Sequence, residues 1–231
     1  MKETKKVWVI IPAFNEENSI GLVLNAIPDS LVEEVIVVDN NSKDATAANA
    51  KVAGASVIKQ TMQGYGNACL KGIEFLENKA DSDSIVVFLD ADFSDHPEEM
   101  NKLLEPIFTN GFDMVIGSRA LGNREKGSMM PQQLFGNWLA TSLIRVFYKH
   151  VYSDLGPFRA IRYDKLLQLQ MCDKTYGWTV EMQLKAAKMK MKITEVPVSY
   201  RKRVGVSKIS GTVKGTILAG YRIIYTIFKH L

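Results

Sequence analysis

The chain has 231 residues, of which 46% are hydrophobic and 23% are charged, and its formal net charge is +4. These values are those of an ordinary globular protein and suit one large α/β domain or two small ones. The positive charge is mild and gathers late in the chain, at 185–192 and 200–208. Such basicity fits phosphate-bearing substrates or an anionic membrane surface and argues against sequence-specific nucleic-acid binding. The lysines of 185–192 could equally form a solvated helix face.

The two cysteines, Cys69 and Cys172, lie far apart and in no C-x-x-C pattern. We therefore expect neither a disulfide framework nor a structural zinc site, and a reducing cytoplasm is the natural compartment. The apolar run after the basic N-terminus, 7–11, is too short for a signal peptide. No uncharged apolar stretch reaches the roughly 20 residues that span a bilayer. The expected location is the cytoplasm or the cytoplasmic membrane face.

The first half of the chain alternates short β-branched runs with longer amphipathic stretches. This alternation predicts a mostly parallel sheet with helices on both faces. The predicted strands are 7–11, 34–38, 55–59, 84–89 and 113–117. The predicted helices between them are 18–26, 44–53, 66–79 and 97–108.

The second half continues with helical patterns at 134–150 and 178–190 and a strand-like run at 193–200. The stretch 120–133 is long, polar and glycine-bearing, so we expect a mobile loop there. Loops of this kind often cover active sites.

The C-terminal stretch 211–231 is apolar on most sides, with Lys214, Arg222 and Lys229 interspersed. The central position of Arg222 argues against a membrane-spanning helix. Two interpretations stay open at this point. The stretch is either a helix that docks on the core or an amphipathic helix that lies on a membrane surface.

Polar residues follow four of the predicted strands. The exits read "PAFNEE" (12–17), "DNNSKD" (39–44), "DADFSDHP" (90–97) and "GSR" (117–119). Ligands of open parallel sheets bind outside the carboxyl ends of the strands. Four polar exits at one edge are hard to explain as simple turns, and they predict a binding site there.

Two acids of the third of these exits are spaced to act together. Asp90 and Asp92 are two residues apart, so in extended backbone they project to the same side. Carboxylate pairs of this kind suit a hard divalent cation with oxygen ligands. Turn formation or helix capping is the alternative for the pair. Asp95, just before "HPEE", is expected to cap a helix.

The ordered set of motifs resembles family 2 glycosyltransferases of GT-A fold, above all the dolichyl- and polyprenyl-phosphate mannosyl- and glucosyltransferases. The motifs are "VIIPAFNEENSIGLVL", "VIVVDNNSKDAT", "GYGNACLKG", "VVFLDADFSDHPEEM", "MVIGSRALG", "DLGPFRAIR", "YGWTVEMQLKAA", "ITEVPVSYRKR" and "GVSKISG". The resemblance covers nearly the whole chain. It implies one GT-A domain over 1–231, with a nucleotide-sugar half (1–119), an acceptor half (120–210) and a C-terminal amphipathic helix (211–231).

The resemblance also implies roles for individual residues. Asp90 is expected to touch the nucleotide and the metal, and Asp92 to ligate Mg²⁺ or Mn²⁺ bridging the diphosphate. A divalent ion there would stabilise the diphosphate that leaves when a nucleotide sugar is cleaved. The remaining implied substrate-binding residues are Pro12, Phe14, Asn15, Glu16, Asp39, Asn41, Gly66, Arg119, Trp178, Arg203 and Lys208. Arg119, Arg203 and Lys208 resemble phosphate-binding cations, with surface charge as the alternative.

Glu181 and Trp178 have open roles. In inverting relatives that glycosylate hydroxyls, an acid in the region of Glu181 is the base that deprotonates the acceptor. A lipid-phosphate acceptor needs no strong base, and Glu181 would then only orient the sugar, or face solvent. Trp178 could stack on a sugar or fill the core. Asp92, Glu181 and Arg119 are the predicted catalytic residues.

Three departures from the family pattern bear on specificity. Asn40 replaces an acid of many relatives, and Ser94 stands where some carry a glutamine metal ligand. Gln132 and Gln133 lie where several relatives carry an arginine for the acceptor phosphate, with Arg124 and Lys126 upstream.

The leading hypothesis is an inverting, metal-dependent transfer of a hexose from a UDP- or GDP-sugar to a polyprenyl phosphate. The first alternative is a hydroxyl acceptor with Glu181 as base. A sugar-phosphate nucleotidyltransferase is a distant alternative, because "IPAFNEENS" lacks the glycine and basic residues of that class. A non-enzymatic binding module is disfavoured by the acidic strand end.

Overall fold

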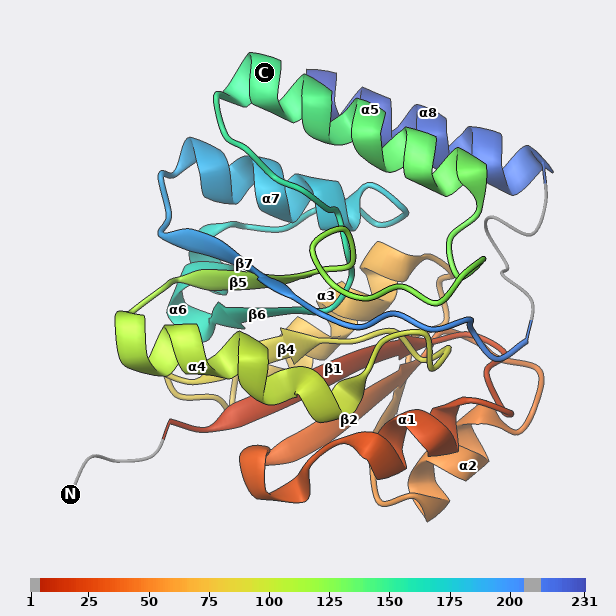
Figure 1. The fold of residues 1–231 in the computed structure, drawn as a ribbon. Helices are drawn as coiled ribbons and strands as arrows, with labels where there is room; N and C mark the ends of the chain where they lie inside the picture. Colours follow the sequence, from red (N-terminus) through yellow and green to blue (C-terminus); the bar gives the residue numbers. More distant parts are fainter. Residues whose placement is uncertain (1–4, 206–212) are drawn as a thin grey trace.

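One seven-stranded sheet organises the protein (Figure 1). The computed structural model describes residues 5–205 and 213–231. The strand order is β3-β2-β1-β4-β6-β5-β7. The strands are β1 (Val7–Ala13), β2 (Glu34–Asp39), β3 (Ser56–Lys59), β4 (Ile85–Phe88), β5 (Met114–Ser118), β6 (Arg159–Arg162) and β7 (Ile193–Pro197). Both predicted halves of the chain therefore contribute to the same sheet.

Strand β6 is the one that runs against its neighbours. It pairs antiparallel with β4 and β5, whereas β1, β2, β3 and β4 pair parallel, as do β5 and β7. Arg159, the first residue of β6, is opposite Phe88 near the end of β4 and opposite Ile116 of β5. The segment that precedes β6 therefore lies at the sheet edge where the parallel strands end.

Helices cover both faces of the sheet (Figure 1). They are α1 (Ile20–Ala26), α2 (Thr46–Val52), α3 (Tyr65–Leu76), α4 (Met100–Asn110), α5 (Pro131–Tyr148), α6 (Tyr163–Gln168), α7 (Trp178–Lys188) and α8 (Val213–Lys229), with 3₁₀ turns at Asp29–Leu31 and Pro97–Glu99. Successive side chains of a strand point to opposite faces. Accordingly Val9 packs in the core with α1 and α4, and Ile10 in the core with α3 and α7.

The structure confirms the predicted strands and helices and adds two elements that were not predicted, β6 and α6. The sequence of β6 is RAIR, with an arginine at each end, which hides the strand from hydrophobic patterning. Arg159 is nevertheless completely buried, because its guanidinium donates hydrogen bonds to the carbonyls of Gly156 and Thr179. Helix α5 begins at Pro131, so the loop predicted over 120–133 ends earlier.

The C-terminal helix docks on the protein by one face. Ile227 of α8 is buried in the core that contains α7. Figure 1 shows α5 and α8 as an outer layer beyond α7. Within the described part of the chain, no helix has the length and apolarity needed to cross a bilayer.

Candidate active site

An open cavity of about 240 Å³ lies at the carboxyl edge of the sheet. The ends of β1, β2 and β4 meet there with the first turn of α3. The lining residues are Pro12, Ala13, Phe14, Glu16, Asn40, Gln63, Gly64, Tyr65, Ala68, Asp90, Ala91, Asp92, Tyr176 and Arg203. The cavity thus occupies the position at which parallel sheets bind their ligands.

Asp90 and Asp92 form the acidic wall of this cavity. The hydroxyl of Tyr65, in the first turn of α3, donates a hydrogen bond to Asp90 Oδ1 over 3.0 Å. The backbone N–H of Ser94 donates to Asp92 Oδ1 over 2.9 Å, and the Ser94 hydroxyl donates to the same oxygen. Both carboxylates are therefore held in place by neighbouring donors.

Arg203 connects the acidic wall to the end of β1. Its guanidinium lies 3.2 Å from Asp92 Oδ2 and 3.0 Å from Glu16 Oε1. The backbone positions it, because Val204 N–H donates to the Asp92 carbonyl and Arg201 N–H to the Ser94 carbonyl. The segment after β7 is thereby fixed along the acidic turn after β4.

The crowding of acids has electrostatic consequences. Burial, together with the negative charge of Asp92, raises the pKa of Asp90 to about 7. Burial and the charges of Asp90 and Asp92 also raise the pKa of Asp95 well above its ordinary value. Among the described atoms, neither carboxyl oxygen of Asp95 has a hydrogen-bond partner. The residue that precedes the 3₁₀ turn is His96, whose side chain makes no capping hydrogen bond, so the expectation that Asp95 caps a helix is wrong.

The acidic wall fits a divalent cation that is shared with a ligand. Two facing carboxylates repel each other, and a hard cation with oxygen ligands relieves that repulsion. In the described parts of the chain, no cluster of three or more His, Cys, Asp or Glu side chains could hold a metal ion by itself. Asp90 and Asp92 would therefore be the protein ligands, and substrate oxygens and water would complete the coordination shell.

Strained backbone marks the same edge of the sheet. Asn15, Asn41 and Phe93 have φ values of 53°, 65° and 61°, and each follows the end of a parallel strand. Asparagine tolerates this left-handed conformation better than other side chains, whereas phenylalanine does not. The guanidinium of Arg201 lies 3.7 Å from the centre of the Phe93 ring and helps to hold it. Such outliers cluster at functional sites.

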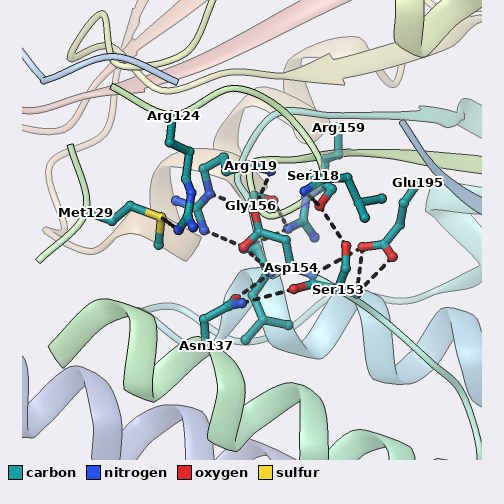
Figure 2. Close-up of polar contacts among 12 residues, drawn as sticks. Ser118, Arg119, Arg124, Met129, Asn137, Ser153, Asp154, Gly156, Arg159 and Glu195 are labelled. Atoms are coloured by element: carbon teal, nitrogen blue, oxygen red, sulfur yellow. Dashed lines mark hydrogen bonds and ion pairs between the residues drawn. The ribbon is translucent and has the colours of Figure 1, made fainter. Parts of the chain in front are cut away.

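A second polar network builds the edge of the sheet near β5 and β6 (Figure 2). Arg119 forms a bidentate ion pair with Asp154, with Nε–Oδ2 2.7 Å and Nη2–Oδ1 2.8 Å. Glu195 of β7 accepts hydrogen bonds from the N–H groups of Ser153 and Asp154. Asn137 of α5 donates to the Ser153 carbonyl. Burial alone would raise the pKa of Asp154, but Arg119 holds it below its ordinary value.

The profile described as glycosyl transferase family 2 matches residues 8–169. The chain belongs to glycosyl transferase family 2. Relatives resemble this family 2 glycosyltransferase along its length. An uncharacterised glycosyltransferase of Mycobacterium tuberculosis is 34% identical over 92% of this chain and 94% of the relative. An undecaprenyl-phosphate mannosyltransferase of Micrococcus luteus is 31% identical over 91% of this chain and 90% of the relative.

Solved structures of similar fold include glucosyl-3-phosphoglycerate synthase from Mycobacterium tuberculosis. Its complex with Mn²⁺, UDP-glucose and phosphoglyceric acid has a TM-score of 0.77 at 23% identity, over 99% of this chain and 80% of the synthase chain. The complex with Mn²⁺, UDP and glucosyl-3-phosphoglycerate gives 0.78 at 22% identity, over 99% and 81%. At these identities the likeness shows the fold alone, and it confirms the predicted GT-A type.

The cavity of this family 2 glycosyltransferase brings together only part of the predicted substrate site. The predicted residues that line it are Pro12, Phe14, Glu16, Asp90, Asp92 and Arg203. The predicted residues outside the lining are Asn15, Asp39, Asn41, Gly66, Arg119, Trp178 and Glu181. Lys208 lies outside the described residues. Two residues of this second group hold the loops that follow β1 and β2. Asn15 Oδ1 accepts a hydrogen bond from Lys43 N–H, and Asp39 Oδ1 accepts one from Ser42 N–H.

Trp178 and Glu181 need correction. The Trp178 side chain is completely buried and packs edge-on against Phe88, with ring centres 4.7 Å apart, so it fills the core and does not offer a sugar platform. The Glu181 carboxylate is also completely buried and does not line the cavity. It is exposed neither to solvent nor to the cavity, so the alternative in which it acts as a base is not supported.

Glu181 instead fixes the segment around residues 172–173, which packs against α3. Its carboxylate accepts hydrogen bonds from the N–H groups of Cys172 and Asp173 and pairs with Lys185 over 2.7 Å. The secured segment packs tightly on α3, because a Cβ on Gly66 would lie 2.0 Å from the Asp173 carbonyl oxygen. Gly66 therefore permits the close packing of α3 on this segment.

Several cavity residues escaped the sequence analysis. Tyr65 and Tyr176 lie inside the quoted motifs "GYGNACLKG" and "YGWTVEMQ", where aromatic residues beside glycines were an available signal. Asn40 was noted only as a departure from the family. Its side chain accepts from Gly64 N–H and donates to the Met62 carbonyl, so it shapes the loop before α3.

Proposed function

We propose that this glycosyltransferase moves a hexose from a UDP- or GDP-sugar to a polyprenyl phosphate, with inversion at the anomeric carbon. The observation that carries the proposal is the pairing of Asp90 and Asp92 with Arg203 around one cavity at the strand ends. The choice of acceptor draws on the similarity to the undecaprenyl-phosphate mannosyltransferase, which extends over about nine-tenths of both chains.

The charged residues of the cavity suit the departure of a diphosphate. Transfer breaks the bond between the anomeric carbon and the diphosphate oxygen, and the nucleoside diphosphate leaves with the electron pair. Asp90 and Asp92 would hold Mg²⁺ or Mn²⁺, which supplies positive charge to stabilise the leaving group. Arg203 adds a fixed cation beside them. Tyr65 keeps Asp90 oriented through its hydrogen bond.

The acceptor completes the reaction by forming a bond from one of its oxygens to the anomeric carbon. A lipid phosphate is already an anionic nucleophile and requires no protein base, which agrees with the burial of Glu181 away from the cavity. Arg119 would attract such a phosphate from the neighbouring network, although Asp154 neutralises part of its charge.

A small acceptor is the second candidate. The structural neighbour was solved with phosphoglyceric acid, a soluble anion. An anionic acceptor of that kind would still use the cations near β5 and would not require a lipid. The two candidates differ in the product that accumulates.

The test uses the full chain with UDP-glucose or GDP-mannose, Mg²⁺ or Mn²⁺, and either undecaprenyl phosphate or phosphoglyceric acid. We expect nucleoside diphosphate release coupled to labelled lipid, and its loss in Asp92→Asn. Asp83→Asn, at an exposed position away from the cavity, is the matched control. Release that persists unchanged in Asp92→Asn would overturn the metal assignment. Product formed only with the soluble acceptor would overturn the lipid assignment.

A further inference from the structure

The outer faces of α5 and α8 together form an unusual surface, which we call the α5–α8 face. The two helices run side by side, with Phe147 against Phe228 and the Tyr148 hydroxyl donating to the Ile227 carbonyl (Figure 1). Their shared inner side packs on α7. The α5–α8 face is the side directed away from the sheet.

Large apolar side chains are concentrated on this face. Ten of the twenty exposed large apolar side chains among the described residues belong to these two helices. They are Leu134, Phe135, Trp138, Val146 and Phe147 of α5 and Leu218, Tyr221, Ile224, Tyr225 and Phe228 of α8. On α8 the spacing of three or four residues places these side chains along one side, whereas on α5 three of them gather near the start of the helix and two near its end. Large exposed apolar patches on soluble proteins mark sites of interaction with a protein, a membrane or a ligand.

The charged residues of the two helices are all positive. Residues 131–149 and 213–229, which hold α5 and α8, include five Lys and Arg and no Asp or Glu. The rest of the chain has 24 Lys and Arg against 25 Asp and Glu. A net positive segment that borders an apolar face is attracted to anionic phospholipid headgroups, while its apolar side chains enter the boundary with the acyl chains.

We propose that the α5–α8 face binds the surface of an anionic phospholipid bilayer. Trp138, Tyr221 and Tyr225 are of the residue types that favour the membrane–water interface. The charge argues against a second copy of the chain as the occupant, because two such faces would bring together cations without any acid to pair with them.

Hydrogen bonds from helix α5 link the proposed surface to the polar network around Arg119. Asn137, on the same helix as Trp138, donates to the Ser153 carbonyl and accepts from Leu155 N–H. Between these two residues lies Asp154, the partner of Arg119 (Figure 2). Membrane contact would therefore hold the network around Arg119 near the headgroups. That last consequence rests on the proposed lipid-phosphate acceptor, whereas the membrane contact itself does not.

Tryptophan fluorescence offers a direct readout. The chain has three tryptophans, and Trp8 and Trp178 are buried whereas Trp138 is 61% exposed. We expect the emission to shift to shorter wavelength when phosphatidylcholine–phosphatidylglycerol vesicles are added, because Trp138 alone can leave water. Phosphatidylcholine vesicles should cause a smaller shift, and high salt should weaken the anionic response.

Vesicle flotation tests the surface with matched variants. The double variant Phe135→Ser with Tyr221→Ser removes one exposed aromatic from each helix and leaves Trp138 as the probe. We expect its partitioning to anionic vesicles to fall at least about tenfold. Val52→Ser with Phe108→Ser is the control, since both are exposed apolar residues on other helices, and it should float like the unaltered protein.

Three results would overturn the proposal. These are an unshifted Trp138 emission, equal flotation of the two double variants, or a concentration-dependent dimer that only the Phe135→Ser, Tyr221→Ser variant abolishes. Transfer to a short, water-soluble prenyl phosphate separates this proposal from the proposed function. The face variant should retain that activity, so loss of flotation with intact transfer supports the membrane contact. Absence of transfer in the unaltered protein would count against the proposed acceptor, while flotation would still decide the membrane contact.

Discussion

Replacing Glu181 by glutamine distinguishes a structural role from a catalytic one. In the native protein the completely buried carboxylate lies 2.7 Å from Lys185 Nζ and 2.7 Å from Asp173 N, and Cys172 N is 3.1 Å away. Glutamine has nearly the same shape but no charge. Its NH₂ group also has to face either Lys185 or a backbone N–H, all of which are donors.

The size of the effect follows from these contacts. Breaking a fully buried ion pair by removing one partner costs about 3–5 kcal/mol. The side chain of Lys185 is 18% exposed and can reach water, which lowers that cost. The backbone N–H groups of Cys172 and Asp173 lose a charged acceptor, which offsets part of the reduction. We therefore expect Glu181→Gln to lower the free energy of unfolding by about 2–4 kcal/mol.

Urea unfolding at neutral pH measures this loss, with Glu105→Gln on the exposed side of α4 as the control. Steady-state transfer is measured in parallel below the unfolding transition. Because the segment held by Glu181 leads to Tyr176 in the cavity, the KM for the nucleotide sugar should rise several-fold while kcat changes little. An unchanged free energy of unfolding, together with a kcat lowered about a hundredfold or more, would refute this reasoning and restore Glu181 as a base.

Three further predictions concern other parts of the molecule. Gly66→Ala should lower the free energy of unfolding by about 1–3 kcal/mol, because its Cβ would collide with a carbonyl oxygen; Gly21→Ala, in open space on α1, should instead raise it by up to about 1 kcal/mol in the same urea titration. Asp92→Asn should weaken the Mn²⁺ dependence of nucleotide-sugar binding, measured by calorimetry with and without a chelator, and equal affinity in both conditions for the unaltered protein would contradict the metal site. Because the pKa of Asp154 is lowered in the folded protein, its ion pair stabilises the fold fully above the ordinary carboxyl pKa of about 3.9. This contribution is lost as the pH falls through the lower pKa of the folded state. In an acid titration, Asp154→Asn should therefore lose less stability below pH about 4 than the unaltered chain.

The elements that could be predicted were those whose burial is visible in their own sequence. The runs of β1 and β2 are continuously apolar because both faces of a parallel strand are covered. Strand β6 has no such run, and its place depends on pairing with β4, more than 70 residues earlier. Helix α7 was predicted as a helix, but its seven buried residues lie on nearly all sides of the helix. Its sequence therefore could not show that Glu181 faces inward.

The candidate site divides in the same way. Asp90 and Asp92 were predictable because the end of an apolar strand and the topology of a parallel sheet determine where they lie. The contact of Arg203 with Glu16 joins residues 187 positions apart, so no local pattern predicts it, and the family resemblance named the two residues only separately. The partners of Arg119 and Glu181 depend on loop conformations at 153–155 and 172–173, which periodicity does not determine. The mobility predicted for the 120–133 loop stays a prediction.

The place of β6 in the sheet also makes the two halves of the chain dependent on each other for folding. Strand β4 has β1 on one side and β6 on the other, and all four of its residues are buried. A fragment that stops at residue 119 would have β1–β4 but an open, apolar edge along β4, and β5 would lack both of its neighbours. Unprotected edges of this kind recruit other strands. During synthesis the nucleotide-sugar half would therefore remain prone to aggregation until residues 159–162 have been made and inserted.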